Sequence, residues 1–397
     1  MTANDFTQQE IDQIRAETPG VKNVIHFNNA GSSLMPSQVL HRMTTYLDLE
    51  FRYGGYEAAD ICHDQIEQVY DSIAGLINAR RHEIAVVENA TRAWDMAFYS
   101  IPFQPGDRIL TGLASYGSDY IAFLQMAAQK GVQIDIIPDD ETGQVSVSAL
   151  ENMMDDRVKL IVLTHVPTNG GLVNPAAAVG KVARHANVCY LLDACQSVGQ
   201  MPLDVEEIGC DMLSATSRKY LRGPRGMGFL YVRQERIAEL MPPFLDLHAA
   251  TWVEKNRYEI RPDARRFENW ECNYTGKLGL GTAVDYAKKQ GVDRIWNRVQ
   301  KLASYLRSSL EALPGVSVHD KGAVKCGIVT FMAAGKKVDD IKAAMHAQKI
   351  NVTTTTRFGT RLDMEDRGLD ALMRASLHYF NTEEEIDHFC TELTKIL

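Results

Sequence analysis

GCDMLSATSRKYLRGPRGMGFLYV, residues 209–232, is the stretch that decides the fold. Hydroxyl side chains and an arginine surround Lys219, and a glycine-rich turn then leads into an apolar strand. Backbone N–H groups and Ser or Thr hydroxyls arranged in this way hold phosphate. A lysine surrounded by positive charge and partly desolvated has a lowered pKa, which makes it a better nucleophile towards a carbonyl. Taken alone, the stretch also fits an exposed lysine beside a surface turn.

A second stretch, CYLLDACQSVGQ at 189–200, has the pattern of a buried strand that ends in Asp193. In open α/β sheets, ligands bind at the carboxyl ends of the parallel strands. A carboxylate at this place can pair with a protonated ring nitrogen. The alternative is that Asp193 caps the next helix.

The chain on both sides of these stretches alternates helix-like and strand-like segments. Helices are expected at 63–78, 92–100, 118–130 and 175–186, and strands at 83–88, 107–112, 132–137, 158–164, 187–192 and 226–232. The strands are short and apolar on both faces, which predicts a mainly parallel sheet covered by helices on both sides. The fold class is therefore α/β.

A helix-rich run at 274–313 precedes a C-terminal part with two or three strands. Further helices are expected at 337–348, 366–373 and 382–396, and the last of them opens with the capping box of Thr382 and Glu385. The predicted division is an N-terminal arm at 1–25 that packs with the small domain, a large domain at 26–265, and a long helix with a small α+β domain at 266–397.

Composition excludes several classes of function. The 397 residues carry a net charge of −9, which argues against a nucleic-acid or anionic-membrane partner. The N-terminus has no basic region followed by an apolar stretch, and no apolar run reaches the roughly 18 residues of a membrane span. The seven cysteines are scattered and form no CxxC pair, which disfavours a disulfide framework or a zinc site. A cytoplasmic location is expected.

The chain resembles the class V aminotransferases, the cysteine-desulfurase-like group of fold-type I enzymes that use pyridoxal 5′-phosphate (PLP). The motifs run in the family's order from HFNNAGSSLMP at 26–36 to RASLHYFNTEEEID at 374–387. The resemblance implies a mainly parallel, seven-stranded type of sheet in a large PLP-binding domain. It implies that Lys219 forms the Schiff base with PLP, that Asp193 pairs with the pyridinium nitrogen, and that Gln196 reaches the phenolic oxygen.

Other cofactor contacts follow from the same resemblance. Ala90 and Thr91 would bind the phosphate at a helix N-terminus, and Thr216 with Arg218 would complete the phosphate cup. Tyr116 falls where family members place an aromatic ring, often His, on the cofactor face, and is expected to be catalytic. Thr168 falls where desulfurases carry Asn near the phenolic oxygen. Without the family pattern, Thr91 also fits a simple helix cap and Tyr116 a core aromatic residue.

Substrate contacts are expected from Arg374, which would form a bidentate pair with the α-carboxylate of an amino acid. Asn29 and Ala30 of the first motif are further candidates. Arg357 is expected to bind a second anionic group of the substrate, and Arg361 stands close to it. Solvated loop charge is an equally good interpretation of both arginines.

One family feature is missing. Desulfurases carry a mobile Cys shortly before the carboxylate-binding Arg, whereas VTTTTRFGTRLDMEDRG at 352–368 contains none. GGYEAAD at 54–60, PTNGGLVNP at 167–175 and SRKYLRGPRG resemble instead a subgroup of isopenicillin-N-epimerase-like proteins and ergothioneine C–S lyases. We therefore expect β-elimination of a cysteine-type substrate and no persulfide chemistry.

Other functions stay open at this point. An aminotransferase or epimerase of a small amino acid is the first alternative, and a non-catalytic relative that acts as a binding protein is the second. A nucleotide-binding Rossmann enzyme is disfavoured because no GxGxxG motif follows the first strands.

The segment 266–286, RFENWECNYTGKLGLGTAVDY, resembles the family's stretch that reaches the neighbouring subunit. Trp270 and Glu271 stand where desulfurases carry a Gly-Thr pair at the partner's phosphate. A homodimer is expected, with Trp270 and Glu271 near the partner's active site.

Overall fold

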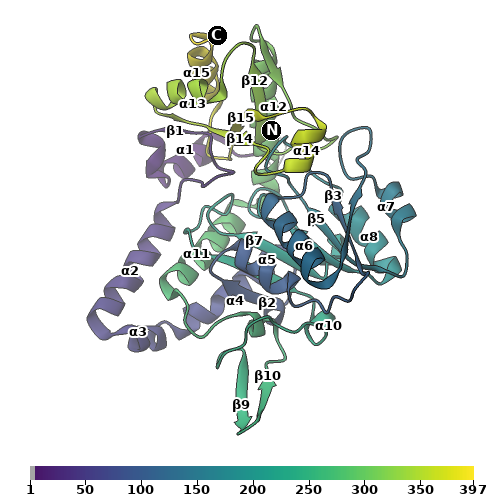
Figure 1. Cartoon of the computed structure of the whole chain (residues 1–397). Coiled ribbons are helices and arrows are strands. Elements are labelled where there is room, and N and C mark those ends of the chain that lie inside the picture. Colours follow the sequence, from purple (N-terminus) through teal and green to yellow (C-terminus); the bar gives the residue numbers. More distant parts are fainter. Residues whose placement is uncertain (1–4) are drawn as a thin grey trace.

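A seven-stranded sheet forms the centre of the larger part of the molecule (Figure 1), in the order β2-β8-β7-β6-β5-β3-β4. The computed structural model describes residues 5–397. Only β8 runs against its neighbours, β2 and β7. The strands are β2 (Ile84–Val87), β3 (Arg108–Gly112), β4 (Gln133–Ile137), β5 (Val158–Thr164), β6 (Cys189–Asp193), β7 (Met212–Thr216) and β8 (Gly228–Val232).

The apolar character of both strand faces explains why helices cover both sides of the sheet. Along β5, Leu160 and Val162 belong to one core cluster, whereas Ile161 belongs to the other. The helices that pack into the first cluster include α5 (Ala90–Phe98) and α6 (Gly117–Lys130). Those that pack into the second cluster include α4 (His63–Ile77), α7 (Val147–Met153), α8 (Ala176–Ala186) and α11 (Tyr274–Gln290). The predicted mainly parallel, two-sided α/β sheet is confirmed.

Several elements lie outside these layers. Helix α2 (Ser37–Tyr53) contacts α11 and continues into α3 (Gly55–Ile61), and the short helices α9 (Val205–Ile208) and α10 (Gln234–Ile237) lie in the connections that flank β7 and β8. Strands β9 (Ala250–Glu254) and β10 (Arg257–Ile260) form an antiparallel hairpin. Figure 1 shows this hairpin projecting away from the sheet. The sequence patterns considered above did not predict it.

The C-terminal part has its own four-stranded antiparallel sheet, in the order β11-β12-β15-β14. Its strands are β11 (Val316–Val318), β12 (Ile328–Ala333), β14 (Thr353–Thr356) and β15 (Ala371–Ser376), and its helices are α12 (Val292–Glu311), α13 (Val338–Ala347), α14 (Arg361–Asp366) and α15 (Glu383–Thr394). The capping box predicted for α15 is confirmed, because the Thr382 hydroxyl accepts from Glu385 N and the Glu385 carboxylate accepts from Thr382 N.

The beginning of the described chain also contacts this part. Helix α1 (Gln8–Ala16) places Arg15 Nη1 at 2.8 Å from the Phe380 carbonyl oxygen and 2.8 Å from a Glu385 oxygen. Strand β1 (Ile25–His26) pairs in parallel with β13 (Ile350–Asn351). The division at 25 and 265 stays a prediction, and residues 1–4 of the arm lie outside the described residues.

One expected element is wrong. Residues 366–373 do not form a helix, because α14 ends at Asp366 and β15 begins at Ala371. Gly368 between them has φ +63°, a left-handed conformation that ends the helix. The apolar ALMRAS segment then pairs with β12 and β14 as a central strand. No helix among residues 5–397 combines the length and apolarity needed to cross a bilayer.

Candidate active site

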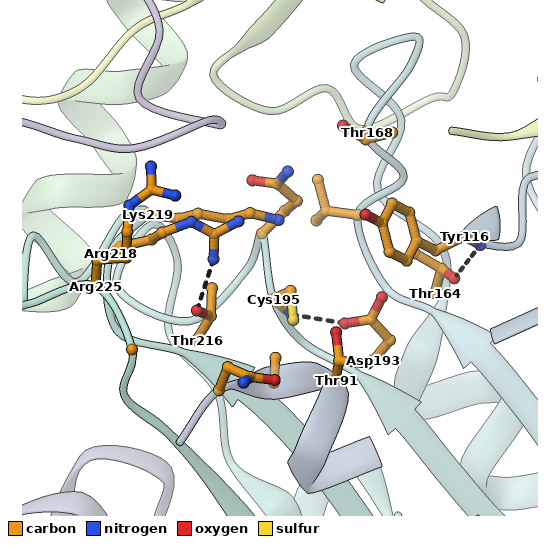
Figure 2. A pocket seen from close by; sticks show the side chains of 15 residues that line it. Thr91, Tyr116, Thr164, Thr168, Asp193, Cys195, Thr216, Arg218, Lys219 and Arg225 are labelled. Atoms are coloured by element: carbon orange, nitrogen blue, oxygen red, sulfur yellow. Dashed lines mark hydrogen bonds between the residues drawn. The ribbon is translucent and has the colours of Figure 1, made fainter. Parts of the chain in front are cut away.

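Loops at the carboxyl ends of the parallel strands enclose a cavity of about 500 Å³. Its walls come from the ends of β2, β3, β5, β6 and β7, which are far apart in sequence. Four of these strands, β7, β6, β5 and β3, are neighbours in the sheet, and β8 separates β7 from β2. The lining residues are Asn89, Ala90, Thr91, Tyr116, Thr164, Val166, Thr168, Asp193, Cys195, Gln196, Thr216, Arg218, Lys219, Arg225 and Gly226. Figure 2 shows how ten of these side chains surround the cavity.

Lys219 lies on the loop between β7 and β8. Backbone hydrogen bonds close this loop, since Ser217 N donates to Met227 O and Gly223 N donates to Ser217 O, each at 3.0 Å. Desolvation lowers the pKa of the Lys219 amine, Arg218 and Arg374 lower it further, and Cys195 and Asp193 act in the opposite direction. The amine is therefore more readily neutral, and so more nucleophilic, than an exposed lysine.

Asp193 is the last residue of β6, and its carboxylate is the only acidic group among the residues that line the cavity. Its Oδ1 accepts from Cys195 N at 2.9 Å. Its carbonyl oxygen accepts from His165 N. The carboxylate is thus held at the end of the strand, where it can pair with a protonated pyridine nitrogen.

The phosphate end of the cavity is built on the N-terminus of α5. The Asn89 side chain caps this helix by accepting from Arg92 N, which leaves the first backbone N–H groups, at Ala90 and Thr91, without partners inside the helix. A Cβ on Gly228 would lie 2.9 Å from Ala90 N, so glycine allows β8 to approach this terminus. Free N–H groups and the helix dipole suit a phosphate.

Arg218 and Thr216 stand together at the same end. Arg218 Nη1 donates to Thr216 Oγ1 at 2.9 Å (Figure 2). The guanidinium still has further N–H groups to offer to an anion. The structure brings together all four residues expected at the phosphate: Ala90, Thr91, Thr216 and Arg218.

Gln196 fits the role expected beside a phenolic oxygen. Its Nε2 donates to the Ala30 carbonyl oxygen at 3.1 Å, while its Oε1 is buried and has no hydrogen-bond partner within the described chain. A polar atom buried beside a cavity without a partner is costly unless a bound group satisfies it. Together with Asp193, Lys219 and the α5 N-terminus, this atom fits PLP.

Arg374, on strand β15, does not itself line the cavity, but it contacts Thr168, which does. Its side chain is buried, and Nη1 donates to Thr168 Oγ1 at 2.5 Å. Nη2 lies 3.5 Å from Asn28 Oδ1, and buried Nε has no partner within residues 5–397. No carboxylate in the described chain pairs with this guanidinium, so an anion bound in the cavity would provide its counterion.

Tyr116 caps α6 at the end of β3, and its ring faces the cavity (Figure 2). Its backbone N–H donates to Thr164 Oγ1. The side chain is 38% exposed, which places it at the mouth and not in the core. A core role for this aromatic residue is therefore excluded.

Two expected substrate residues are not brought to the cavity. Asn29 is fully buried, and its amide donates to the Ser376 and His26 carbonyl oxygens. Arg357 pairs with Asp370 and, at 3.8 Å, with Glu365. Neither side chain lines the cavity, because each is engaged within the protein.

The other expected positions lie as follows. Ala30 contributes its carbonyl oxygen to Gln196 rather than a contact in the cavity wall. Arg361 is two-thirds exposed and pairs with Glu365. Trp270 is 56% exposed, and its backbone N–H donates to Asp246. Glu271 lines a small neighbouring pocket with Gly226.

Among the residues near the cavity that were not predicted, three carry polar groups of interest. Asn28 stands next to the predicted Asn29, and Arg225 belongs to the glycine-rich turn quoted first. Asp119 follows Tyr116 by three residues, is buried, and has an unpartnered Oδ2. Burial and the nearby Asp193 raise the pKa of Asp119 well above its ordinary value. Only the adjacency of these residues to predicted motifs could have identified them.

The similar proteins of known sequence named here carry the same name and match nearly the whole chain. A protein of Methanothermobacter thermautotrophicus named "Probable cysteine desulfurase" is 26% identical over 383 residues, 94% of this chain and 95% of that protein. A protein of the same name from Synechocystis sp. is 29% identical over 385 residues, 93% of this chain and 90% of that protein.

Solved structures agree with the fold. The apo cysteine desulfurase of Thermococcus onnurineus NA1 has a TM-score of 0.91 at 26% identity and covers 97% of both chains. The cystine C–S lyase C-DES, in complex with cysteine persulfide, has a TM-score of 0.86 at 24% identity over 95% of this chain and 99% of that one. The likeness to C-DES shows the fold alone.

The model of one protein family, described as aminotransferase class-V, matches residues 25–389. That span contains the lysine loop, the aspartate strand and the buried arginine described above. The fold-type I architecture expected from the resemblance is confirmed. The chain therefore belongs to the class-V aminotransferase family and is an enzyme whose cofactor is pyridoxal 5′-phosphate.

Proposed function

We propose that this enzyme cleaves the Cβ–S bond of a cysteine-type amino acid by β-elimination, as a C–S lyase. One observation supports this proposal above the others. The loop between β14 and α14, where desulfurases of this family carry their sulfur-accepting cysteine, reads Arg-Phe-Gly-Thr at 357–360 and contains no thiol.

Contacts with the large domain hold this loop in place. Gly117 N donates to Gly359 O at 2.8 Å, and Asn169 Nδ2 donates to Thr360 Oγ1 at 2.8 Å. A Cβ on Gly117 would lie 2.7 Å from Phe358 O, so glycine permits this close contact. A fixed loop without a thiol suits a wall of the substrate pocket better than a carrier of sulfur.

The cysteines of the chain are poorly placed to accept sulfur. Cys326 is fully buried, and burial raises the pKa of its thiol to about 12. Cys390 lies on α15, away from the cavity lining, with a pKa raised to about 11 by burial. Cys195 lines the cavity, but burial and Asp193 raise its pKa. A neutral thiol is a weak nucleophile, so none of the three favours persulfide formation.

The proposed reaction gives a task to Arg374, Thr168, Lys219 and Tyr116. Arg374 binds the α-carboxylate and orients the Cα–H bond, and Thr168 holds the guanidinium in place. Lys219 Nζ removes the Cα proton. Bound PLP supplies an electron sink for the pair left at Cα.

The leaving group then departs with the electrons of the Cβ–S bond. The Tyr116 hydroxyl, which interacts electrostatically with Arg374, protonates the sulfur as it leaves. Hydrolysis of the remaining unsaturated amino acid gives pyruvate and ammonia. In total, one substrate and one water give one thiol, one pyruvate and one ammonium ion.

The known relatives are compatible with a cysteine-type substrate. Two of them are named cysteine desulfurases, and a structural neighbour is a cystine C–S lyase. The motifs at 54–60 and 167–175 support the proposed assignment to the subgroup of isopenicillin-N-epimerase-like proteins and ergothioneine C–S lyases.

The products test this proposal. The PLP-loaded enzyme is incubated with cysteine, cystine and S-substituted cysteines, and pyruvate, ammonia and alanine are measured, with Lys219→Ala as the control. Equal amounts of pyruvate and ammonia, absent in the control, are expected. Alanine in place of pyruvate would identify a desulfurase and contradict the proposal.

The same panel separates the alternatives. An aminotransferase would accumulate pyridoxamine phosphate and release a 2-oxo acid that keeps the substrate's side chain, so no thiol would be split off. An epimerase would exchange Cα hydrogen with solvent deuterium and lose stereochemistry. A non-catalytic relative would bind amino acids without turnover.

We also propose that the enzyme is a homodimer, with Trp270 and Glu271 near the partner's cavity. Large apolar side chains are exposed on α2, α3 and the segment 244–270, among them Phe51 at 88%, Tyr56 at 75% and Trp252 at 71%. Exposed apolar groups of this size commonly mark protein interfaces. Light scattering after gel filtration tests the proposal, and a monomer at micromolar concentration would contradict it.

A further inference from the structure

The cavity is strongly cationic in a chain of net charge −9. Arg218, Lys219 and Arg225 line it, against Asp193 as the single acid among the lining residues. Three of these four groups have a task once PLP is bound. Lys219 joins the cofactor covalently, Asp193 pairs with the pyridine nitrogen, and Arg218 stands at the phosphate end with Thr216.

Arg225 is the group without a task. Arg225 is exposed at the rim of the cavity that it lines, and its guanidinium makes no hydrogen bond or ion pair within the described residues 5–397. By contrast, Arg357 and Arg361, the arginines expected to bind an anion, are neutralised by Asp370 and Glu365. An unpaired arginine beside a cavity, with acids available elsewhere on the surface, suits a bound anion.

The position of Arg225 indicates which anion it meets. It stands on the turn Gly223–Gly226, and the positive φ of Gly226, +79°, closes this turn just before β8. Figure 2 shows Arg225 and Arg218 on the same side of the cavity, with Tyr116 on the opposite side. Arg225 is therefore on the side of the cavity where Arg218 contacts Thr216, away from Tyr116 and Thr168.

Charge balance supports this assignment. A phosphate monoester carries about −1.5 to −2 at neutral pH. The N-terminus of α5 offers roughly +0.5, and Arg218 offers one full charge. Together these offer about +1.5, which leaves up to about half a negative charge of the phosphate for a second cation to balance. We propose that Arg225 is a second arginine ligand of the cofactor phosphate, contributed by the same chain that holds Lys219.

This proposal depends on PLP as the cofactor and not on the reaction that follows. A residue that binds the phosphate contributes affinity for PLP and none for pyridoxal, which lacks the phosphate. The difference between these two affinities therefore isolates the contact, whereas a general disturbance of the turn would weaken both ligands equally.

The experiment compares apoenzymes of wild type, Arg225→Gln and Arg225→Lys. Dissociation constants for PLP and for pyridoxal are measured by fluorescence titration. Arg361→Gln serves as the matched control, since this arginine is exposed and paired with Glu365 outside the cavity.

Arg225→Gln should weaken PLP binding about tenfold, the effect of one partly solvated charge-assisted hydrogen bond, and leave pyridoxal binding unchanged. Arg225→Lys should recover part of the loss because it keeps the charge. Inorganic phosphate should compete with PLP less well in Arg225→Gln than in wild type. Arg361→Gln should match wild type throughout.

Three outcomes would overturn the proposal. PLP affinity in Arg225→Gln equal to wild type would show that the guanidinium does not contact the phosphate. Equal losses for PLP and pyridoxal would show that the residue acts through the turn. Unchanged PLP affinity with a raised KM for an anionic substrate would assign Arg225 to the substrate.

Discussion

Replacing Arg374 by glutamine is expected to lower the activity of the enzyme without lowering the stability of the apoenzyme. The guanidinium is only 8% exposed, and no carboxylate within the described chain neutralises it. In the apoenzyme it is therefore a buried, uncompensated cation. Glutamine is smaller, neutral, and able to keep one hydrogen bond to Thr168, so the substitution removes a desolvation cost and little else.

The substrate complex behaves differently. In the proposed complex the α-carboxylate is the counterion of Arg374, and loss of one partner from a buried ion pair costs about 3–5 kcal/mol. The specificity constant kcat/KM of Arg374→Gln should fall by roughly 100- to several-thousand-fold, while the urea midpoint of the apoenzyme stays equal to or above that of wild type.

A matched control stands in the same part of the molecule. Arg307 is nearly buried and pairs with the fully buried Asp320 at 2.6 Å. Arg307→Gln should therefore destabilise the protein by about 3–5 kcal/mol, because it leaves Asp320 without its partner. If Arg374→Gln destabilised the apoenzyme as much as Arg307→Gln and left KM unchanged, the role of Arg374 as the free carboxylate site would be refuted.

Three other perturbations have definite outcomes. Tyr116→Phe should keep PLP bound and lower kcat by about 10- to 100-fold. The loss should be smaller for substrates whose thiol leaves without full protonation. An unchanged kcat for all substrates would exclude Tyr116 as the acid that protonates the leaving sulfur. Gly117→Ala should push the Phe358 carbonyl oxygen away from α6, because the added Cβ would lie too close to it. Amide hydrogen exchange at 357–360 should become faster, and kcat/KM should fall by about 10- to 100-fold. An unchanged exchange rate would show that the contact at Gly117 does not hold the loop. Folding lowers the pKa of Lys219 from 10.5, so just below that pH the unfolded chain binds more protons than the folded chain, and the stability of the apoenzyme should rise with pH there. The rate of PLP attachment should reach half its maximum below pH 10.5. A midpoint at or above that pH would contradict the lowered pKa.

Much of the large domain could be predicted because the residue pattern of its strands indicates directly which strand faces are buried. The VKLIVLT run of β5 is apolar at successive positions, a pattern that only a strand buried on both faces requires. The carboxyl ends of such strands meet at one edge, which is why Asp193 could be expected at a ligand site. The placement of Tyr116 and the roles of Asp193 and Lys219 towards the cofactor came from the resemblance and not from the pattern.

The features that could not be predicted depend on contacts between residues far apart in the sequence, which a local sequence pattern does not indicate. ALMRAS at 371–376 became a strand because β12 and β14 flank it, although its composition also suits a helix. Asn28 rather than Asn29 reaches Arg374, since a shift of one residue in an irregular segment reverses which side chain points inward. Arg357 was an open choice between substrate and solvent, and the distant Asp370 determined its contact.

Lys219 is the residue on which the cofactor role of this site depends. Borohydride reduction of the PLP-loaded enzyme, followed by proteolysis and mass spectrometry, tests this role directly because reduction fixes the cofactor on the lysine that holds it. The phosphopyridoxyl group is expected on the peptide that contains Lys219 and on no other, and it should be absent from Lys219→Ala. The cofactor on another lysine, or on none after full loading, would rule out Lys219 as the cofactor lysine.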